Sequence, residues 1–346
     1  MSVDYQRGQR PVKRQIPGAQ IAGATALISG VSVFVNSYGV RAVTSPTVYT
    51  TAKNLVATLV LGGASLVAWR VRVRRDGSTP ANFATPSREP TASHDPRAGT
   101  SFAPATPVRP GALHWLGLAY VGVVGGGLAF VLFFNGLAQS APAPAAFWRD
   151  TMVLWVAVLA VPFLRERVRW WNVAAVALLI LGEITLTGGV GHLGASRGES
   201  SVLAATVLWA VEVVIAKRLL RCVSPAALAV VRMGVGGAAL IAYLAATGSL
   251  GALVTLNATQ IGWALWTGLL LSAYVATWMA ALARARALDV TSVLVASALV
   301  TWLLQLAAGT TTLARNSLGL VLIALGALLV GWAMMRAPRS ELSVGT

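Results

Sequence analysis

Cysteine, histidine and acidic residues are all scarce in this chain of 346 residues, which has one cysteine, three histidines and 11 Asp and Glu residues. The single Cys222 excludes a disulfide-stabilised scaffold. Charged residues reach only 11% and hydrophobic residues 56%, with a mean hydropathy of +0.70, whereas a soluble domain carries about 25% charged residues. This balance excludes a soluble fold and predicts an all-α integral membrane protein.

The motifs of several enzyme classes are also missing. The three histidines and Cys222 lie far apart and give no metal-ligand spacing. No Walker-type loop occurs, so no ATP drive is expected, and no Ser/His/Asp arrangement is visible. Gly125-Gly126-Gly127 lies inside an apolar run, where it allows packing or bending and does not bind phosphate. We therefore expect no cofactor, no metal and no enzymatic activity.

Long apolar runs are what the chain has instead. A helix needs about 20 apolar residues to cross the hydrocarbon core of a bilayer. Ten runs meet this length: 20–39, 46–69, 113–137, 144–164, 170–188, 199–216, 225–246, 261–283, 289–308 and 317–335. Ten membrane-spanning helices are therefore predicted.

The net charge of +16 reports on topology. The basic residues lie between the apolar runs and not in a nucleic-acid-binding motif, so we expect no nucleic acid partner. If every run crosses the membrane, 21 of the 27 Lys and Arg residues fall on one side, and only Arg41, Arg197 and Arg315 on the other. Basic loops stay in the cytoplasm, which predicts a multi-pass protein of the plasma (inner) membrane with both termini cytoplasmic.

One loop differs in composition from the rest. Residues 70–112 hold seven of the 15 prolines and few apolar side chains, too few to offset the entropy of ordering the chain, so this segment is predicted to be a disordered cytoplasmic loop. The remaining divisions are a basic N-terminal tail, a first repeat in two parts, a second repeat and a C-terminal tail. Their bounds are 1–19, 20–69 with 113–189, 199–335 and 336–346.

The ten runs divide into two similar sets of five. Ser45-Pro46 opens the second run and Ser224-Pro225 the seventh, and one cation, Lys53 or Arg232, follows seven residues after each Ser-Pro. The fifth and tenth runs also align, at an offset of 144 residues. Because five is odd, the second set enters the membrane from the other side, so the repeat is inverted.

The segment from Trp209 to Lys217, then Ser224-Pro225 and Arg232, together with 163–167 after the fourth run, resembles the drug/metabolite transporter (DMT) superfamily, EamA type. Two departures are Lys53, where the family often has Arg, and the long 70–112 loop. The resemblance implies ten helices around a cavity between two halves, which opens to either side in turn. It leaves the substrate open, since these proteins carry amino acids, drugs, sugars or nucleotide sugars.

Charged side chains inside a span are costly and mark functional positions or bridges. We expect two ion pairs, Lys53–Asp150 and Glu212–Arg232, either at the mouths of the cavity or as static bridges between helices. Arg149 is adjacent to Asp150, and the two are expected to point in different directions. Of the other acids, Glu183 is expected to bridge helices and Asp289 to cap one.

Uncharged polar and aromatic side chains complete the candidate substrate-binding or gating set, although any one of them can instead fill a helix interface. They are Asn36, Tyr49, Trp148, Trp209, Tyr274, Trp278 and Gln305. Aromatic rings suit an apolar or cationic cargo.

The sequence thus predicts a secondary transporter, an exporter or exchanger of a small metabolite or drug-like solute by alternating access. Its expected partners are that solute and the lipid bilayer. The intramembrane acids Asp150 and Glu212 make the proton a candidate coupling ion, and a homodimer is left open. Two alternatives are a membrane enzyme acting on a lipid-linked substrate and a non-transporting scaffold or sensor that uses the 70–112 loop.

Overall fold

The computed structural model describes residues 18–43, 45–75, 111–140, 142–166, 168, 170–186, 196–310 and 313–336. Every regular element among them is a helix. Most of the two predicted tails (1–19 and 336–346) and most of the predicted 70–112 loop lie outside these residues. The start of that loop does not, because helix α2 (Pro46–Arg75) continues through it; the loop boundary predicted at residue 70 was therefore wrong.

All ten predicted runs fall on helices, several of which are divided into shorter elements. In chain order these are α1 (Gly18–Ala42), α2, α3 (Ala112–Ala119), the π-helix η1 (Tyr120–Leu128), α4 (Ala129–Ala138), α5 (Pro142–Asp150), α6 (Met152–Leu164), α7 (Trp170–Leu186), α8 (Arg197–Leu219), α9 (Pro225–Ala246), α10 (Gly251–Val254), α11 (Ala258–Arg284), α12 (Ala287–Val295), α13 (Ser297–Ala307) and α14 (Leu313–Arg336). Only the short α10 was not predicted.

Seven of the described helical segments are long and apolar enough to cross a membrane: α1, α2, α3 to α4, α5 to α6, α9, α11 and α12 to α13. The apolar parts of α7 and α14 are shorter. Helix α8 carries charged residues at both ends and Glu212 in between. The protein is thus all-helical with several candidate spans, and ten crossings remain a prediction.

Local sequence explains where several helices begin. Ser224 accepts a hydrogen bond from the Ala227 backbone N–H and is followed by Pro225 in the first turn of α9. These are the favoured residues at a helix start. Ser45-Pro46 precedes α2 in the same way, with the Val48 N–H 3.4 Å from the Ser45 hydroxyl. The two Ser-Pro landmarks of the repeat therefore have the same structural role.

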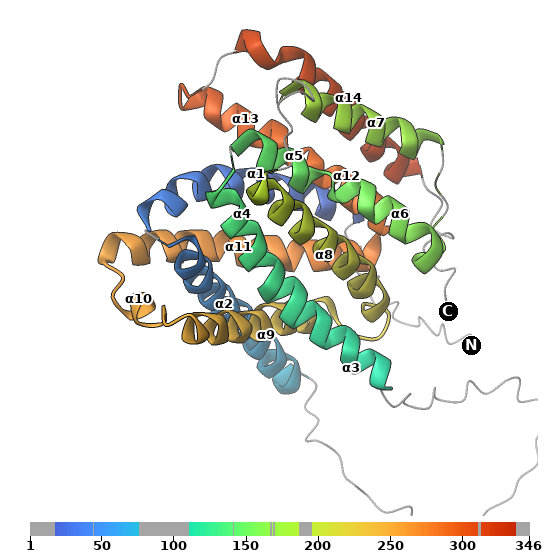
Figure 1. The fold of residues 1–346 in the computed structure, drawn as a ribbon. Helices are drawn as coiled ribbons and strands as arrows, with labels where there is room; N and C mark the ends of the chain where they lie inside the picture. The colour runs from blue at the N-terminus through green and yellow to red at the C-terminus, as the bar shows by residue number, and fades with distance from the viewer. Residues whose placement is uncertain are drawn as a thin grey trace, which may run out of the picture.

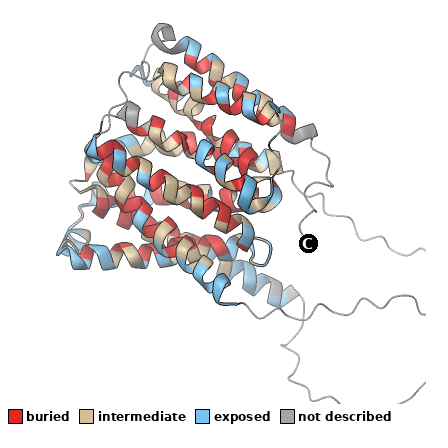
Figure 2. Cartoon of the chain, turned by 45° about the vertical axis from the view of Figure 1, so that its right-hand side comes forward, coloured by how far each residue is buried: buried red, intermediate tan, exposed pale blue. Residues whose placement is uncertain are grey.

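The helices form one bundle, with α7 and α14 side by side at one edge and α2, α9 and α10 at another (Figure 1). Buried residues lie between the helices and exposed ones face outward (Figure 2). Many of the exposed side chains are large and apolar, such as Leu59, Trp115 and Leu328. Such a surface suits a lipid environment and is unusual in a soluble protein.

Helix packing is reciprocal between the two predicted halves. Helix α1 packs on α11, α12 and α13, while α8 packs on η1, α4, α5 and α6. On α7 and α14, a Cβ added to Gly182 would meet Ile323 at 2.6 Å, and one added to Gly326 would meet Leu179 at 2.9 Å. The same 144-residue offset that aligns these runs in sequence relates the two contacts.

A second reciprocal contact involves the aligned cations. An added Cβ on Gly268 would lie 2.9 Å from the carbonyl oxygen of Lys53. One on Gly126 would overlap the carbonyl oxygen of Arg232. Each aligned cation therefore stands where its own helix crosses a glycine of a neighbour, which allows the backbones to approach closely.

Candidate functional site

A cavity of about 610 Å³ lies among helices of both predicted halves. At one end the cavity reaches Ser29 and Thr291. Toward the other end it reaches Ser37, Leu137 and Gln305, which lie near the C-terminal ends of α1, α4 and α13. Nine of the eleven candidate residues line it: Asn36, Lys53, Asp150, Trp209, Glu212, Arg232, Tyr274, Trp278 and Gln305. Its volume is in the range of small-molecule sites.

The predicted Glu212–Arg232 pair is present in the cavity wall. Arg232 Nε donates to one oxygen of Glu212 at 2.5 Å and Nη2 to the other at 3.1 Å. Both side chains are more than nine-tenths buried. A buried guanidinium that binds both oxygens of one carboxylate is a strong, geometrically fixed contact.

The π-helix η1 holds this pair in position. The carbonyl oxygen of Gly125 accepts from Trp209 Nε1 at 3.0 Å and lies 3.4 Å from Arg232 Nη2. An added Cβ at Gly125 would overlap the Glu212 carboxylate, and one at Gly126 would overlap the Arg232 carbonyl. The glycine run thus allows close packing, as predicted, and brings a backbone acceptor to the pair. π-helical turns often occur at functional sites.

Asp150 pairs with its neighbour Arg149, at 2.6 Å, and not with Lys53. The predicted Lys53–Asp150 pair was therefore wrong. Both Arg149 and Asp150 line the cavity, which also corrects the expectation that they point apart. The reason is local: the Arg149 side chain is long enough to reach the carboxylate of the next residue, although adjacent helix positions point about 100° apart.

Lys53 has a different environment. Its Nζ donates to Asn36 Oδ1 at 3.0 Å and lies 4.4 Å from the centre of the Phe134 ring and 5.1 Å from that of Tyr49. Among the described residues, no carboxylate lies within ion-pair distance of this amine. Cation–π contacts of this kind attract a cation without neutralising it.

Aromatic rings form much of the remaining wall. Trp209 packs against Phe130 and Phe133, and Tyr274 stacks on Trp278. Phe130, Phe133 and Phe134 were not predicted as site residues, although their spacing of three and four residues places them on one helix face. That spacing is the signal in the sequence that could have identified them.

Two candidates do not line the cavity. Tyr49 is fully buried, and its hydroxyl donates to Asn36 Oδ1 at 2.8 Å, so it supports a residue that does. Trp148 Nε1 donates to the carboxylate of Glu199 at 3.0 Å, at the start of α8. These two are corrected from cavity residues to residues that hold neighbouring groups in place.

Glu183 and Asp289 are the two remaining acids of the predicted set. The side chain of Glu183 lies outside the described residues. Asp289 is buried in the first turn of α12, where it binds Arg286 at 2.8 Å and accepts from Asn172 Nδ2 at 3.1 Å. It makes no side-chain cap, although an acid in the first turn still suits the helix dipole.

At the end of the bundle away from Gln305, two charged side chains bind the junction of α11 and α12. The Glu166 carboxylate accepts from the N–H groups of Ala287 and Leu288, at 2.8 and 3.3 Å. From the other side, Lys217 Nζ donates to the carbonyls of Leu282 and Ala285, both at 2.6 Å. A charged side chain from another part of the chain thus binds the backbone N–H groups at the start of α12, and another binds the backbone carbonyls at the end of α11.

The backbone conformation of Arg165 explains the position of Glu166. Arg165 ends α6 in the left-handed conformation, with φ of 56°, which turns the next residue toward α12. Burial raises the pKa of the Glu166 carboxyl, against the opposing effects of the two N–H groups and Lys217. In the sequence, residues 163–167 carry only the family resemblance, so this role of Glu166 was not predicted.

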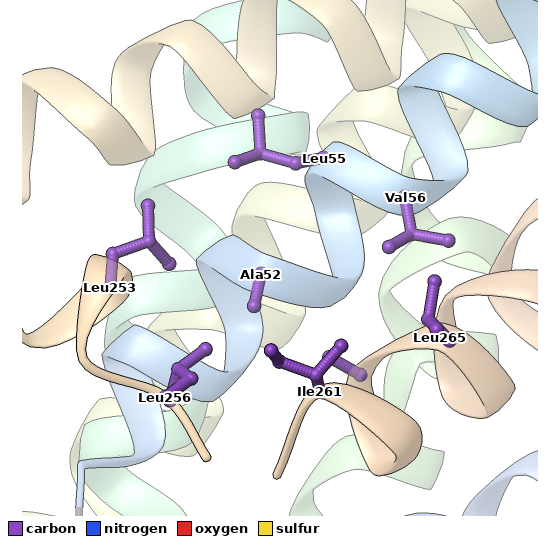
Figure 3. Close-up of a pocket in the computed structure, with 8 residues that line it drawn as sticks. Ala52, Leu55, Val56, Leu253, Leu256, Ile261 and Leu265 are labelled. Atoms are coloured by element: carbon purple, nitrogen blue, oxygen red, sulfur yellow. The ribbon is translucent and has the colours of Figure 1, made fainter. Parts of the chain in front are cut away.

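A smaller pocket of about 200 Å³ lies between α2 and the α10–α11 segment (Figure 3). Aliphatic side chains line it, among them Leu55, Leu253 and Ile261. It offers no polar side chain to orient a solute, so the large cavity is the candidate site. Within the described part of the chain, no group of three or more His, Cys, Asp or Glu residues could hold a metal ion.

Residues 99–188 match the model of the EamA-like transporter family, which belongs to the DMT superfamily. This confirms the resemblance drawn from the sequence. No curated protein matches the chain. A solved structure described as "Crystal structure of protein" superposes with a TM-score of 0.66 and 17% identity, covering 90% of this chain and 97% of that chain. This likeness shows the fold alone.

Proposed function

We propose that this EamA-like, multi-pass membrane protein is a secondary transporter, an exporter or exchanger of a small metabolite or drug-like solute. The observation that carries the proposal is the cavity shared by both halves, which holds ion pairs and aromatic rings. Alternating access requires such a site at the interface of two repeats.

The reciprocal packing supports two inverted five-helix repeats, related by an axis in the membrane plane. Contacts between α1 and α11 to α13 correspond to those between α8 and η1 to α6. The interruptions at Thr151 and Ala296 divide corresponding helices next to the cavity. Discontinuous helices around a central site are typical of secondary transporters.

The charge count supports a plasma membrane location with both termini in the cytoplasm, since 21 of the 27 Lys and Arg residues then lie on the cytoplasmic side. In this orientation the Glu166 and Lys217 contacts form the inner gate, and the cavity extends to the outer face. Transport then requires these contacts to break as the halves rock, while the outer ends of α1, α4 and α13 come together.

The test begins with metabolite profiles of cells that have or lack the protein, followed by flux of each hit into proteoliposomes that contain it. Saturable flux of a hit supports the proposal. Conversion of a hit without net flux supports the membrane enzyme instead. Flux that survives collapse of the pH gradient would exclude the proton as coupling ion.

A further inference from the structure

The charges of the cavity wall do not balance. Five charged side chains line the cavity: Lys53, Arg149, Arg232, Asp150 and Glu212. The two carboxylates are each bound by an arginine, in the Arg149–Asp150 and Glu212–Arg232 pairs. Lys53 is the cation that remains without a carboxylate among these lining residues, and it is only 4% exposed.

Hydrogen-bond donors are in excess at the same cavity. The Lys53 ammonium has three N–H groups, of which one reaches Asn36 Oδ1, and that oxygen also accepts from Tyr49. Trp302 lines the cavity with its side chain 8% exposed, and its Nε1 has no hydrogen-bond partner among the described residues. Buried donors without acceptors are costly, so a ligand that supplies acceptors is favoured.

The rest of the wall is apolar and aromatic. The rings of Phe130, Phe133 and Trp209 form one side and those of Tyr274 and Trp278 another. Such walls bind flat or aliphatic bodies by stacking and by exclusion of water. A cation would also meet aromatic faces, but the charge of Lys53 opposes its entry.

We propose that the cavity takes an organic monoanion, a carboxylate on an aromatic or aliphatic body, whose charge is neutralised by Lys53 and which accepts a hydrogen bond from Trp302. This rests on the proposed function and names its substrate class. In a buried site, a charge-assisted hydrogen bond to the ammonium is stronger than a neutral one. Lys53 is held by Asn36 and the Phe134 ring, so the anion displaces no existing ion pair.

The test measures binding to the purified full chain in detergent, using sets of three probes that share one body. One set is 3-phenylpropionate, 3-phenylpropanamide and 3-phenylpropylamine, and naphthyl and indolyl sets follow the same design. We expect the acid to bind at least about tenfold more tightly than its amide and amine (about 1.4 kcal/mol) in one or more sets. Equal binding within every set, or no binding of any acid, overturns the proposal.

Variants connect that preference to the cavity. Lys53→Met removes the preference for the acid and Lys53→Arg keeps it. Trp302→Phe, which removes the N–H donor and keeps a smaller aromatic ring, weakens acid binding more than amine binding. Arg41→Gln, a change of an exposed cation outside the cavity, leaves the preference intact. If Lys53→Met does not fold, Trp302→Phe alone decides. An acid preference that survives every cavity variant overturns the proposal.

Flux in proteoliposomes separates this inference from the proposed function. Acids that bind in detergent but do not cross the bilayer contradict the transporter and leave the anion site intact. Saturable flux of amines or neutral probes, with none for acids, supports the transporter and contradicts the anion site.

Discussion

Arg232 and Glu212 lie 20 residues apart on α9 and α8 and meet through two hydrogen bonds of 2.5 and 3.1 Å in the wall of the central cavity. The carbonyl of Gly125, from a third element, lies beside the same guanidinium at 3.4 Å. Three helices are therefore joined at one buried charge pair. Breaking it by removal of one partner leaves an uncompensated charge in the interior.

Glu212→Gln keeps the shape of the side chain and removes the negative charge. We expect a loss of stability of about 3 kcal/mol or more, because Arg232 then remains buried without a counter-ion. Unfolding in a detergent–SDS titration measures it. The matched control is Glu199→Gln on the same helix, a buried acid with no ion-pair partner among the described residues, for which a smaller loss of about 1 kcal/mol is expected. Equal losses for the two variants would contradict this role of the pair.

Gly126→Ala tests the close crossing of η1 and α9. The added methyl group would overlap the Arg232 carbonyl and lie 3.1 Å from the Gly236 Cα, so the backbones must separate and the Glu212–Arg232 geometry is disturbed. Overpacking of this kind costs about 1–3 kcal/mol. Gly63→Ala is the control, since nothing lies within 4 Å of its added Cβ and alanine favours a helix. A thermal unfolding midpoint for Gly126→Ala at or above that of Gly63→Ala would disprove the constraint.

Glu166→Gln tests the inner gate. Each oxygen of Glu166 accepts from one N–H group, that of Ala287 or Leu288. The amide replaces one of these acceptors by an NH2 donor that faces an N–H donor, so opening of this end becomes more frequent. The measurement is labelling of Thr291→Cys, in the cavity, by an impermeant maleimide in inside-out vesicles, after Cys222→Ser removes the exposed native thiol. We expect a several-fold faster reaction. Arg284→Gln, which removes a nearby charge that binds the Ala280 carbonyl on its own helix, should leave the rate unchanged; faster labelling in both variants would argue against a specific gate.

The contact of Glu166 with the start of α12 predicts that opening of the inner gate depends on pH. Burial raises the pKa of Glu166 in the closed structure, whereas on opening the carboxyl is hydrated and returns toward its ordinary value of about 4.3. The closed form therefore binds a proton more tightly, and by linkage acidification favours it. Lys217 and Asp289 face this carboxyl and shift the midpoint. Between the raised pKa and the ordinary value, labelling of Thr291→Cys should slow as the pH falls, relative to the Glu166→Gln variant at the same pH. If the ratio of the labelling rates with Glu166 and with Glu166→Gln does not change with pH, the effect is refuted.

Trp148→Phe tests a residue that the sequence suggested for the cavity and the structure removes from it. The variant loses the Nε1 hydrogen bond to Glu199, and we expect about 1–3 kcal/mol lower stability. The affinity for an acid probe such as 3-phenylpropionate should be unchanged. Trp209→Phe, the control, removes a donor inside the cavity and should alter affinity as well. A change of affinity for Trp148→Phe as large as that for Trp209→Phe would return Trp148 to the site.

The helices could be predicted from sequence because membrane crossing imposes a length and a hydropathy that can be counted along the chain. The aligned Ser-Pro pairs and the 144-residue offset also have matching structural roles, since capping depends on a few adjacent residues. Glu212–Arg232 was predictable because both ions lie in apolar runs, where a lone charge is costly.

Other partners could not be predicted, because they depend on helix rotation and on interruptions that no local pattern encodes. Arg149 binds the adjacent Asp150, and Lys53 donates to Asn36 on another helix. The contact of Glu166 with Ala287 spans 121 residues and depends on the left-handed turn at Arg165. A side chain that bonds to a distant backbone leaves no charge pattern in the sequence.

The amino-acid sequence by itself determined that this chain is a helical membrane protein, because burying polar groups in lipid is costly and this cost sets the composition and the length of the apolar runs. The tertiary structure decided which cation has no carboxylate among the cavity residues, which aromatic rings lie beside it and which charged side chains bind the junction of α11 and α12. Those features arise where helices far apart in the chain cross, and the crossing geometry depends on packing at glycines and helix breaks from both halves together.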